Sequence, residues 1–414
     1  MTPLDEVRQL VLSHCARRTP IDVARTDASG LVLAHDIIAT EPVPPFTNTA
    51  VDGYAIQAAD TASGSAELRV IAEVAAGAVA SVAVARGTAI RIMTGAPIPN
   101  GCDAVVMVED TERLGDDRVL VKRHVESGAS IRSAGSDVAV GATVLHAGTV
   151  ITPMVEGVLA SVNAQRVQVY PRVTVGVLST GDELVDDGSP LQPGQIRESN
   201  RTMLLRIIEE TGARIIDLGI IRDDEDVLER ALHDAVNIAG CDVLVSSGGV
   251  SMGDYDVVKA VLGRIADMKW FQIAMKPAKP FAFGTLHNAK GIAVPIFGLP
   301  GNPVSSLMSF ELIARPAIKS MMGRTDVFRP RVLAIVDEDI VRRPDGKVHF
   351  DRVRATWGND GRVHVSRTGE QGSHQLAVTS AANAIMAVPD GEGLAAGSEV
   401  TVTFLGPDAG PIQG

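Results

Sequence analysis

The chain has 414 residues, of which 45% are hydrophobic, 21% charged and 3% aromatic, with a formal net charge of −12; at ~150 residues per domain this length predicts about three domains. The acidic balance argues against a nucleic-acid partner, because a phosphate-binding surface needs clustered Lys and Arg. The three cysteines include no CxxC pair, which argues against a disulfide framework or a zinc ribbon. The sequence also has no signal-peptide pattern and no apolar stretch long enough to span a membrane, so we expect a cytoplasmic protein.

The first part of the chain predicts a helix, an extended segment and a β-rich lobe. Apolar residues spaced three and four apart favour a helix over residues 4–19. Residues 31–46 read as extended and end in the proline-rich stretch EPVPPF. Short β-like runs separated by glycine fill residues 47–142, which predicts a small all-β lobe. Residues 143–171 then form a connector, with a helical segment near 152–162.

From Arg172 the pattern becomes an alternation of strands and helices. Strands are expected at 173–179, 213–221, 243–247 and within GIAVPIFGLP, and helices at 200–211, 225–238, 256–265 and 303–322. The run VTVGVLS is continuously apolar, as expected for a strand buried on both faces. The fold class is therefore multidomain α/β, with a doubly wound, mostly parallel sheet covered by helices on both faces. Residues 326–414 return to β texture and predict a small barrel or sandwich.

Glycine-rich loops follow three of these strands. Ligands bind beyond the carboxyl ends of the strands in an open parallel sheet, so the three loops should share one edge. Glycines let backbone N–H groups approach an anion closely, and Asn302 and Pro303 suit the start of the next helix. We predict a phosphate-type ligand, bound by Thr180, Gly181, Gly248, Gly249, Ser251, Gly253, Asp254, Gly301, Asn302, Pro303 and Ser305.

Charged side chains in and between these loops suggest a metal and an oxyanion. Acids beside phosphates usually bind a divalent cation through oxygen, Mg²⁺ by default, and Glu183, Asp254 and Asp256 are candidates. An acid at such a place can instead cap a helix. In KPAKP, prolines hold Lys276 and Lys279 close together, which suits a tetrahedral oxyanion, although a solvated basic turn is the alternative.

The motifs resemble those of one family. TGDEL, SSGGVSMGDYD, KPAKPFAFG and GLPGNPVSS, in this order, are similar to segments of the molybdopterin molybdenumtransferases, relatives of the gephyrin E domain. Outside the sheet domain, NTAVDGYA (48–55), IMTGAP (92–97), GSDV (135–138) and QGS (371–373), followed by Ala382-Asn383, match further family segments. Ala278 departs from the family pattern, in which glycine is common. The resemblance spans nearly the whole chain.

The resemblance implies a four-part organisation. Residues 1–46 and 143–171 would form an extended linker and dimerisation domain, 47–142 an inserted β lobe, 172–325 a central α/β molybdopterin-binding domain and 326–414 a C-terminal β-barrel. It also implies an elongated homodimer whose active cleft lies between the subunits. Transient contacts with the molybdopterin adenylyltransferase and with cofactor-accepting enzymes are expected, and neither nucleic acid nor membrane is an expected partner.

The implied reaction is insertion of molybdate into adenylyl-molybdopterin, with release of AMP. Glu183 and Asp256 would hold Mg²⁺, and Asp223 would assist unless it is only a surface acid beside a helix. Asp52, Thr94 and Asp137 would act from the cleft walls, although an ordinary Asp-Gly turn or another structural role explains them equally. The expected molybdate ligands are Lys276, Lys279, Ser251, Arg352 and Ser373, the last two on resemblance alone. A molybdopterin adenylyltransferase and a non-enzymatic, gephyrin-like scaffold remain as alternatives.

Overall fold

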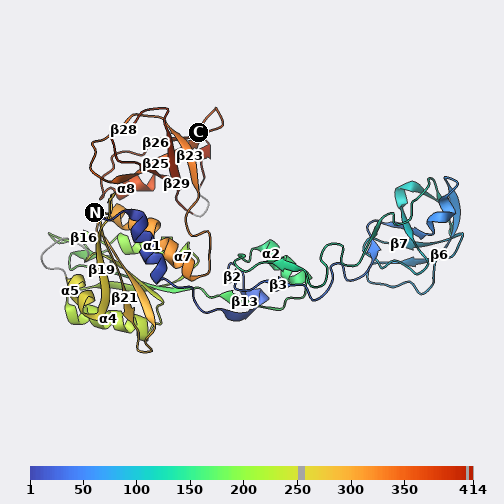
Figure 1. The fold of residues 1–414 in the computed structure, drawn as a ribbon, viewed down its shortest axis with the longest axis horizontal. Helices are drawn as coiled ribbons and strands as arrows, with labels where there is room; N and C mark the ends of the chain where they lie inside the picture. Colours follow the sequence, from blue (N-terminus) through green and yellow to red (C-terminus); the bar gives the residue numbers. More distant parts are fainter. Residues whose placement is uncertain (250–256, 407–409, 414) are drawn as a thin grey trace. The chain divides into compact units, whose positions relative to one another are not determined.

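The computed structural model describes residues 1–249, 257–406 and 410–413, and the chain forms two compact units (Figure 1). The first unit contains Met1–Ile21, Gly30–Ala34 and Gln168–Gly414, and the second contains Asp22–Ser29 and His35–Val167. The first 21 residues, expected in a linker domain, thus belong with the α/β domain. No helix among the described residues is long and apolar enough to cross a membrane.

A six-stranded sheet forms the centre of the first unit. Its order is β17 (Arg214–Ile221), β14 (Thr174–Thr180), β18 (Val243–Ser247), β22 (Ala293–Leu299), β21 (Pro280–His287) and β19 (Ala266–Gln272). The first four strands are parallel to one another, and β21 runs in the opposite direction between β22 and β19, so both of its pairings are antiparallel. The mostly parallel sheet is confirmed, and the two antiparallel pairings of β21 were not predicted.

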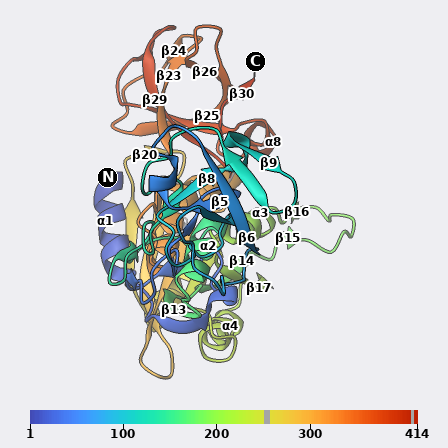
Figure 2. The same cartoon turned by 90° about the vertical axis from the view of Figure 1, so that its right-hand side faces the viewer.

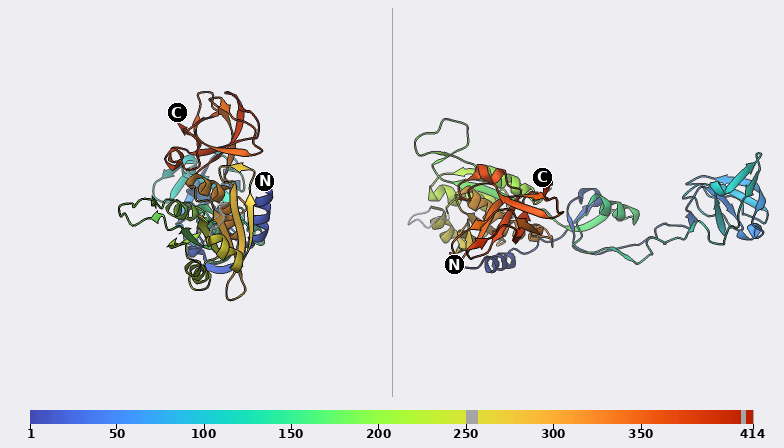
Figure 3. Two further views of the ribbon diagram at one scale, coloured as in Figure 1. Left: turned by 90° about the vertical axis from the view of Figure 1, so that its left-hand side faces the viewer. Right: turned by 90° about the horizontal axis from the view of Figure 1, so that it is seen from above.

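Helices cover both faces of this sheet, as the end-on view in Figure 3 shows. Alternate residues of β14 face opposite ways: Val175 and Val177 join the core beneath α3 (Asn200–Glu209) and α6 (Pro303–Ser309), together with α1 (Leu4–His14). Leu178 joins the other core, beneath α4 (Glu225–Asn237) and α5 (Val257–Ile265). This alternation explains why the strand has to be apolar at successive positions.

Two helix predictions need correction. The first helix ends at His14 rather than residue 19, and β1 (Ile21–Ala24) starts directly after Pro20, which disfavours a helical residue before it. The expected helix 303–322 is divided into α6, a π-helical turn η4 (Phe310–Ala314) and α7 (Arg315–Met321). Pro316 lacks the N–H that would bond the Leu312 carbonyl, and that carbonyl accepts a hydrogen bond from Nε of Arg8 at 2.8 Å instead.

The C-terminal region is a closed five-stranded barrel, which confirms the expected barrel (Figure 2). Its ring runs β23 (Arg331–Val336), β26 (Val363–Arg367), β25 (Val348–Trp357), β27 (Ala384–Val388), β29 (Glu399–Phe404) and back to β23. Flanking it are β20 (Met275–Lys276) and β30 (Ile412–Gln413), each paired with β25, the pair β24 (Ile340–Val341) and β28 (Gly393–Leu394), and α8 (Leu376–Ser380).

The second unit contains the predicted β lobe. Its six-stranded sheet has the order β8 (Ala104–Met107), β5 (Gly53–Ile56), β7 (Thr88–Ile92), β6 (Ala66–Val74), β10 (Arg118–Val121), β9 (Thr111–Leu114). Gly53 is required where β5 meets β8, because a Cβ there would lie 1.9 Å from the Val106 carbonyl oxygen.

Short elements complete the two units. They are β2 (Val32–Leu33), β3 (Ile37–Ile38), β4 (Asn48–Thr49), β11 (Ile131–Arg132), β12 (Thr143–Leu145), α2 (Pro153–Ser161), β13 (Arg166–Tyr170), β15 (Leu184–Val185), β16 (Ile196–Arg197) and the 3₁₀ turns η1 (Arg25–Asp27), η2 (Ala58–Thr61) and η3 (Val108–Asp110). The helix expected near 152–162 is α2, whose N-cap Thr152 accepts a hydrogen bond from the Val155 N–H.

Candidate functional site

A small pocket opens where β14 and β18 end side by side, the edge predicted for the ligand. Its volume is about 120 Å³, and its lining includes Thr180, Glu183, Asn200, Ser247, Gly248 and Gly301. Pockets that bury drug-sized ligands have volumes of ~300–1,000 Å³, so this one can hold only part of a larger ligand. The strands therefore bring five predicted site residues to one pocket: Thr180, Glu183, Gly248, Gly301 and Pro303.

Two glycines after β18 have conformations that other residues rarely adopt. Gly248 has φ +102° and Gly249 φ +70°. A Cβ on Gly248 would lie 3.1 Å from the Thr180 carbonyl oxygen, and one on Gly249 would lie 2.2 Å from the Val258 side chain. Glycine is therefore needed here both for the turn and for the close approach of the loop to its neighbours.

The start of α3 is pinned beneath the pocket by Glu198, which no motif had indicated. Its carboxylate accepts hydrogen bonds from Ser179 Oγ at 3.0 Å, the Arg201 N–H at 2.7 Å and the Thr202 N–H at 3.3 Å. These bonds occupy N–H groups that the helix start would otherwise offer to an anion. Phosphate contacts are therefore expected from the glycine-rich loops rather than from α3.

The predicted metal site is only partly within the described residues. Glu183 is exposed after β14, and the neighbouring Asp182 carboxylate accepts the Asp223 N–H at 3.4 Å. Asp224, not Asp223, caps α4 through the Val227 N–H at 2.9 Å. Asp256, Asp254, Ser251 and Gly253 lie outside the described residues. Within the described part, no group of three or more His, Cys, Asp or Glu side chains could hold a metal ion.

The loop with the two lysines is built on the edge of the barrel. Lys276 belongs to β20, and the Lys279 carbonyl accepts the Ile273 N–H at 2.7 Å. Both lysine residues are exposed. Ala278 between them has φ +75°, the left-handed conformation that glycine adopts more easily than alanine.

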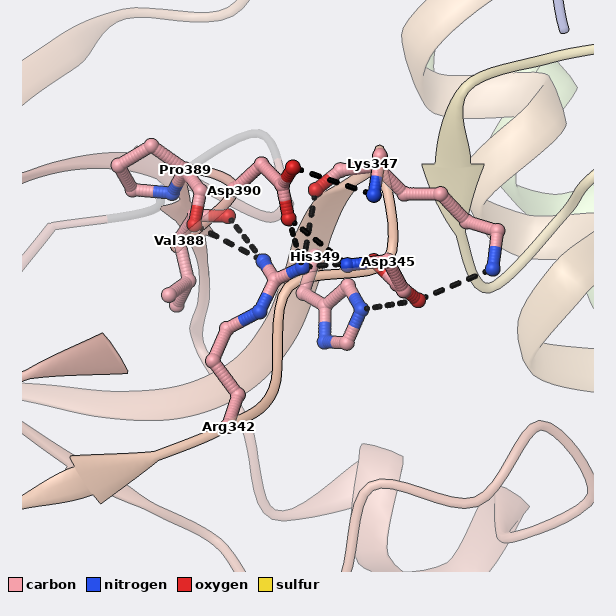
Figure 4. A network of polar contacts seen from close by, with 8 residues as sticks. Arg342, Asp345, Lys347, His349, Val388, Pro389 and Asp390 are labelled. Atoms are coloured by element: carbon pink, nitrogen blue, oxygen red, sulfur yellow. Dashed lines mark hydrogen bonds and ion pairs between the residues drawn. The ribbon is translucent and has the colours of Figure 1, made fainter. Parts of the chain in front are cut away.

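A second pocket, of about 510 Å³, lies beside Lys276 in the barrel. Figure 4 shows the polar network along its wall: Arg342 donates to the carbonyls of Val388 at 3.2 Å and Pro389 at 2.9 Å, and its guanidinium also pairs with Asp345. Burial opposes ionisation of Asp345, but hydrogen bonds from Lys347 and His349 outweigh it and lower the pKa of this carboxyl well below its usual range.

Arg352 and Ser373, expected at the molybdate site, organise a loop of the barrel. The Arg352 side chain is fully buried, and its guanidinium donates to the carbonyls of residues 370, 371 and 372 at 3.0–3.2 Å. Burial lowers its pKa. The Ser373 carbonyl then accepts the Val304 N–H of α6 at 3.1 Å. The loop that carries Ser373 is thereby fixed against the start of α6.

The residues at the start of α6 are placed as expected, with one correction. Asn302 occupies the N-cap position and Pro303 follows it in the first turn, but the Asn302 side chain accepts no capping hydrogen bond. Ser305 is 4% exposed. Asn302 suits the N-cap position as expected, but its side chain does not cap the helix, and the carbonyl of Ser373 accepts an N–H of this turn instead.

In the second unit, Asp52 and Thr94 come together as a pair. Oδ1 of Asp52 accepts hydrogen bonds from both Oγ1 and N of Thr94, each at 2.7 Å. These two bonds lower the pKa of Asp52 below its ordinary value. Asp137 is exposed, and its N–H donates to the Val43 carbonyl at 2.9 Å. The roles of these three residues stay predictions.

Asn200 and Arg197 also line the first pocket and were missed. Neither belongs to a motif, and short polar residues before a helix usually signal only a cap. The one available signal was the position of Asn200 at the start of the predicted helix 200–211, directly after a loop at the ligand edge.

Comparison with known proteins agrees with this architecture. Three family models match: "MoeA N-terminal region (domain I and II)" over residues 2–163, "Probable molybdopterin binding domain" over 176–320 and "MoeA C-terminal region (domain IV)" over 338–405. Molybdopterin molybdenumtransferase 2 of Mycobacterium tuberculosis is 37% identical, covering 98% of this chain and 100% of its own length. Molybdopterin molybdenumtransferase of Haemophilus influenzae is 36% identical, covering 97% and 98%. The crystal structure of the Pyrococcus horikoshii molybdopterin biosynthesis moeA protein has a TM-score of 0.80 at 32% identity, covering 98% of this chain and 100% of that one. The chain belongs to the MoeA family of molybdopterin molybdenumtransferases.

Proposed function

We propose that this protein inserts molybdate into adenylyl-molybdopterin, releasing AMP and forming the molybdenum cofactor. The observation that carries the proposal is similarity over almost the whole chain to proteins named for this activity. The site supports it, because residues of three glycine-rich loops meet at one edge of a molybdopterin-binding-type domain. A reaction of this kind needs groups that bind a pyrophosphate and a separate place for an oxyanion.

The described residues suggest a division of work within the first unit. The loops that contain Gly248 and Gly301 can turn N–H groups toward phosphate oxygens. Lys276 and Lys279 carry two ammonium groups suited to MoO₄²⁻, and the loop held by Arg352 brings Ser373 next to α6. In the reaction, the two dithiolene sulfurs replace two oxygen ligands of molybdate, which leave as water, and a water oxygen attacks the phosphoanhydride, which breaks to give AMP and the terminal phosphate of the cofactor.

We also propose that the reaction depends on Mg²⁺, with Glu183 and Asp256 as ligands. The observation in favour is the chemistry of the side chains near the ends of β14 and β17: they are carboxylates, whose oxygens Mg²⁺ prefers as ligands. The Asp182 carboxylate accepts a hydrogen bond from the Asp223 N–H, so the loops after these two strands lie side by side. A bound Mg²⁺ would neutralise charge on the pyrophosphate. The carboxylate oxygens of Glu183 would bind the ion. Asp223, just after β17, would help to hold it.

The direct test is incubation with adenylyl-molybdopterin, molybdate and magnesium. We expect AMP release together with activation of a cofactor-free molybdoenzyme. Adenylylation of free molybdopterin by ATP would favour the adenylyltransferase alternative. Binding of partner proteins without any turnover would favour the scaffold alternative.

The proposal extends to assembly and location. From the family resemblance we propose a cytoplasmic homodimer whose cleft uses both chains, with transient contacts to the enzymes before and after it in the synthesis. The three free cysteines suit a reducing compartment. Mixing Asp52→Asn with Glu183→Gln chains should restore part of the activity through hybrid dimers, since one cleft of each hybrid keeps both acids. Full activity of a monomer at micromolar concentration would contradict this.

A further inference from the structure

The side chain of Asn200 connects two of the loops that bound the pocket. Its Nδ2 donates to Ser247 Oγ at 2.9 Å, at the end of β18, and to the Gly301 carbonyl at 2.7 Å, in the loop after β22. A carbonyl oxygen can only accept, so the nitrogen of the amide must face Gly301 and the orientation of the side chain is fixed. Both N–H groups of the amide are therefore engaged with the ligand loops.

The base from which Asn200 reaches these loops is itself rigid. Two residues earlier, the buried Glu198 ties the start of α3 to Ser179 of β14. Glu198, just before α3, and Asn200, its first residue, thus contact β14, the end of β18 and the loop after β22. Because the anchor at Glu198 is independent of Asn200, loss of the amide would release the loops without dislodging the helix.

The arrangement is not the one that stability alone would select. Oδ1 of Asn200 is buried and has no hydrogen-bond partner among the described residues. An unpaired buried acceptor lowers stability, and such groups in native proteins call for an explanation. The two N–H groups of the Asn200 amide hold the loops, whereas its oxygen makes no hydrogen bond to the described residues.

We propose that Asn200 is a positioning residue, which sets the spacing of the loops after β18 and β22 and so the geometry in which they bind the phosphate of the nucleotide end of the substrate. The proposal rests on the proposed function for the identity of that ligand. Asn200 acts through Gly301 and Ser247. The Gly301 loop is held at its other end by the bond between the Val304 N–H and the Ser373 carbonyl, so Asn200 fixes the end that this bond leaves unsupported.

The test compares Asn200→Asp with a matched control, using AMP as the probe. Aspartate has nearly the same shape, but it places an oxygen against the Gly301 carbonyl. Asn237→Asp is the control: its Nδ2 donates to the His233 carbonyl at 2.9 Å and its Oδ1 accepts the Ala289 N–H at 2.6 Å, away from the pocket. Losing the two bonds of Asn200 should weaken AMP binding about ten-fold, and the control should leave it unchanged.

Two further measurements separate positioning from general stability. Amide hydrogen exchange at residues 301, 302 and 305 should become faster in Asn200→Asp but not in Asn237→Asp. Ser247→Ala, which removes one of the two bonds, should weaken AMP binding by a smaller factor of about three. An unchanged AMP affinity in Asn200→Asp, or an equal loss in the control, would overturn the proposal. If the wild-type protein bound no AMP, the proposed function would fail, and the exchange comparison would still decide the role of Asn200.

Discussion

The buried ammonium group of Lys319 gives a quantitative prediction for stability. Lys319 lies in α7 and is 7% exposed. Its Nζ donates to the Asp326 carbonyl at 2.7 Å and lies 3.6 Å from the Asp326 carboxylate, in the segment that leads into the barrel. Burial, followed by repulsion from Arg315, lowers the pKa of Lys319 to about 8. The charged form is therefore disfavoured in the folded protein.

The sign of the pH effect follows from the two pKa values. The ordinary value is 10.5, so between about 8 and 10.5 the unfolded chain holds a proton that the folded chain has released. Stability must then rise with pH across this window and stay constant outside it. A difference of about 2.5 pKa units corresponds to about 3 kcal/mol at most, of which about 2 kcal/mol should develop between pH 7.5 and pH 10.

Urea unfolding of the wild type and of Lys319→Met at these two pH values measures the effect. Both tryptophans, Trp270 and Trp357, lie in the first unit, so their fluorescence reports on the unit that contains Lys319. Subtracting the variant removes the contribution of other titrating groups. The stability of the wild type relative to the variant should increase by about 2 kcal/mol from pH 7.5 to pH 10. A constant or decreasing difference would refute the reasoning.

Three further predictions concern the site and the lobe. Thr94→Val should raise the pKa of Asp52 toward its ordinary value, because one of the two hydrogen bonds from Thr94 is lost, whereas Thr94→Ser should keep the pKa low. An NMR pH titration of Asp52 measures both values, and equal pKa values in the two variants would contradict the pairing. Gly53→Ala should destabilise the lobe by several kcal/mol, about 3 or more, because its Cβ would lie 1.9 Å from the Val106 carbonyl oxygen. Limited proteolysis should then cleave the lobe while tryptophan fluorescence of the first unit is unchanged, and a lobe as protected as in the wild type would show that the strands can shift. Glu183→Gln should fold normally but release AMP about 100-fold more slowly even in excess magnesium, and wild-type turnover that survives complete chelation of divalent ions would exclude the proposed metal.

The buried parts of the fold were predictable because burial on both faces demands continuous apolar runs. The strand expected at 243–247 is β18 with the same bounds, since every residue of it is buried. The sequence ADMKWFQ of β19 has no such run, because this strand lies at the side of the sheet and several of its residues are exposed. Its pairing with β21 is a tertiary effect that local pattern cannot reveal.

The interruption of the last helix of the α/β domain also depends on a tertiary contact that the local sequence does not reveal. Pro316 was visible in the sequence as a possible break. What decides the outcome is the Leu312 carbonyl, which Arg8 satisfies from a helix 304 positions earlier in the chain. A sequence reading can locate a backbone group that needs a partner, but the partner is set by the fold.

At the site, the sequence indicated the loops and missed what holds them. Glycine-rich segments after strands can be recognised because their chemistry is local. The contacts of Arg352 with carbonyls of residues 370–372, and those of Asn200 with Ser247 and Gly301, join residues far apart in the chain. Resemblance named Arg352 without showing that its guanidinium organises a loop, and it gave no reason to single out Asn200.

The Asp52–Thr94 pair limits what Asp52 can do in the reaction. A general base works best when its pKa lies near the operating pH, because it must both be ionised and accept a proton readily. The two hydrogen bonds from Thr94 move the pKa of Asp52 the other way, below its ordinary value. Asp52 therefore stays ionised near neutral pH and is a poor proton acceptor. If Asp52 acts in the reaction as predicted, it would present a fixed negative charge with Oδ1 already occupied, and Oδ2 would be the oxygen that orients a reacting group.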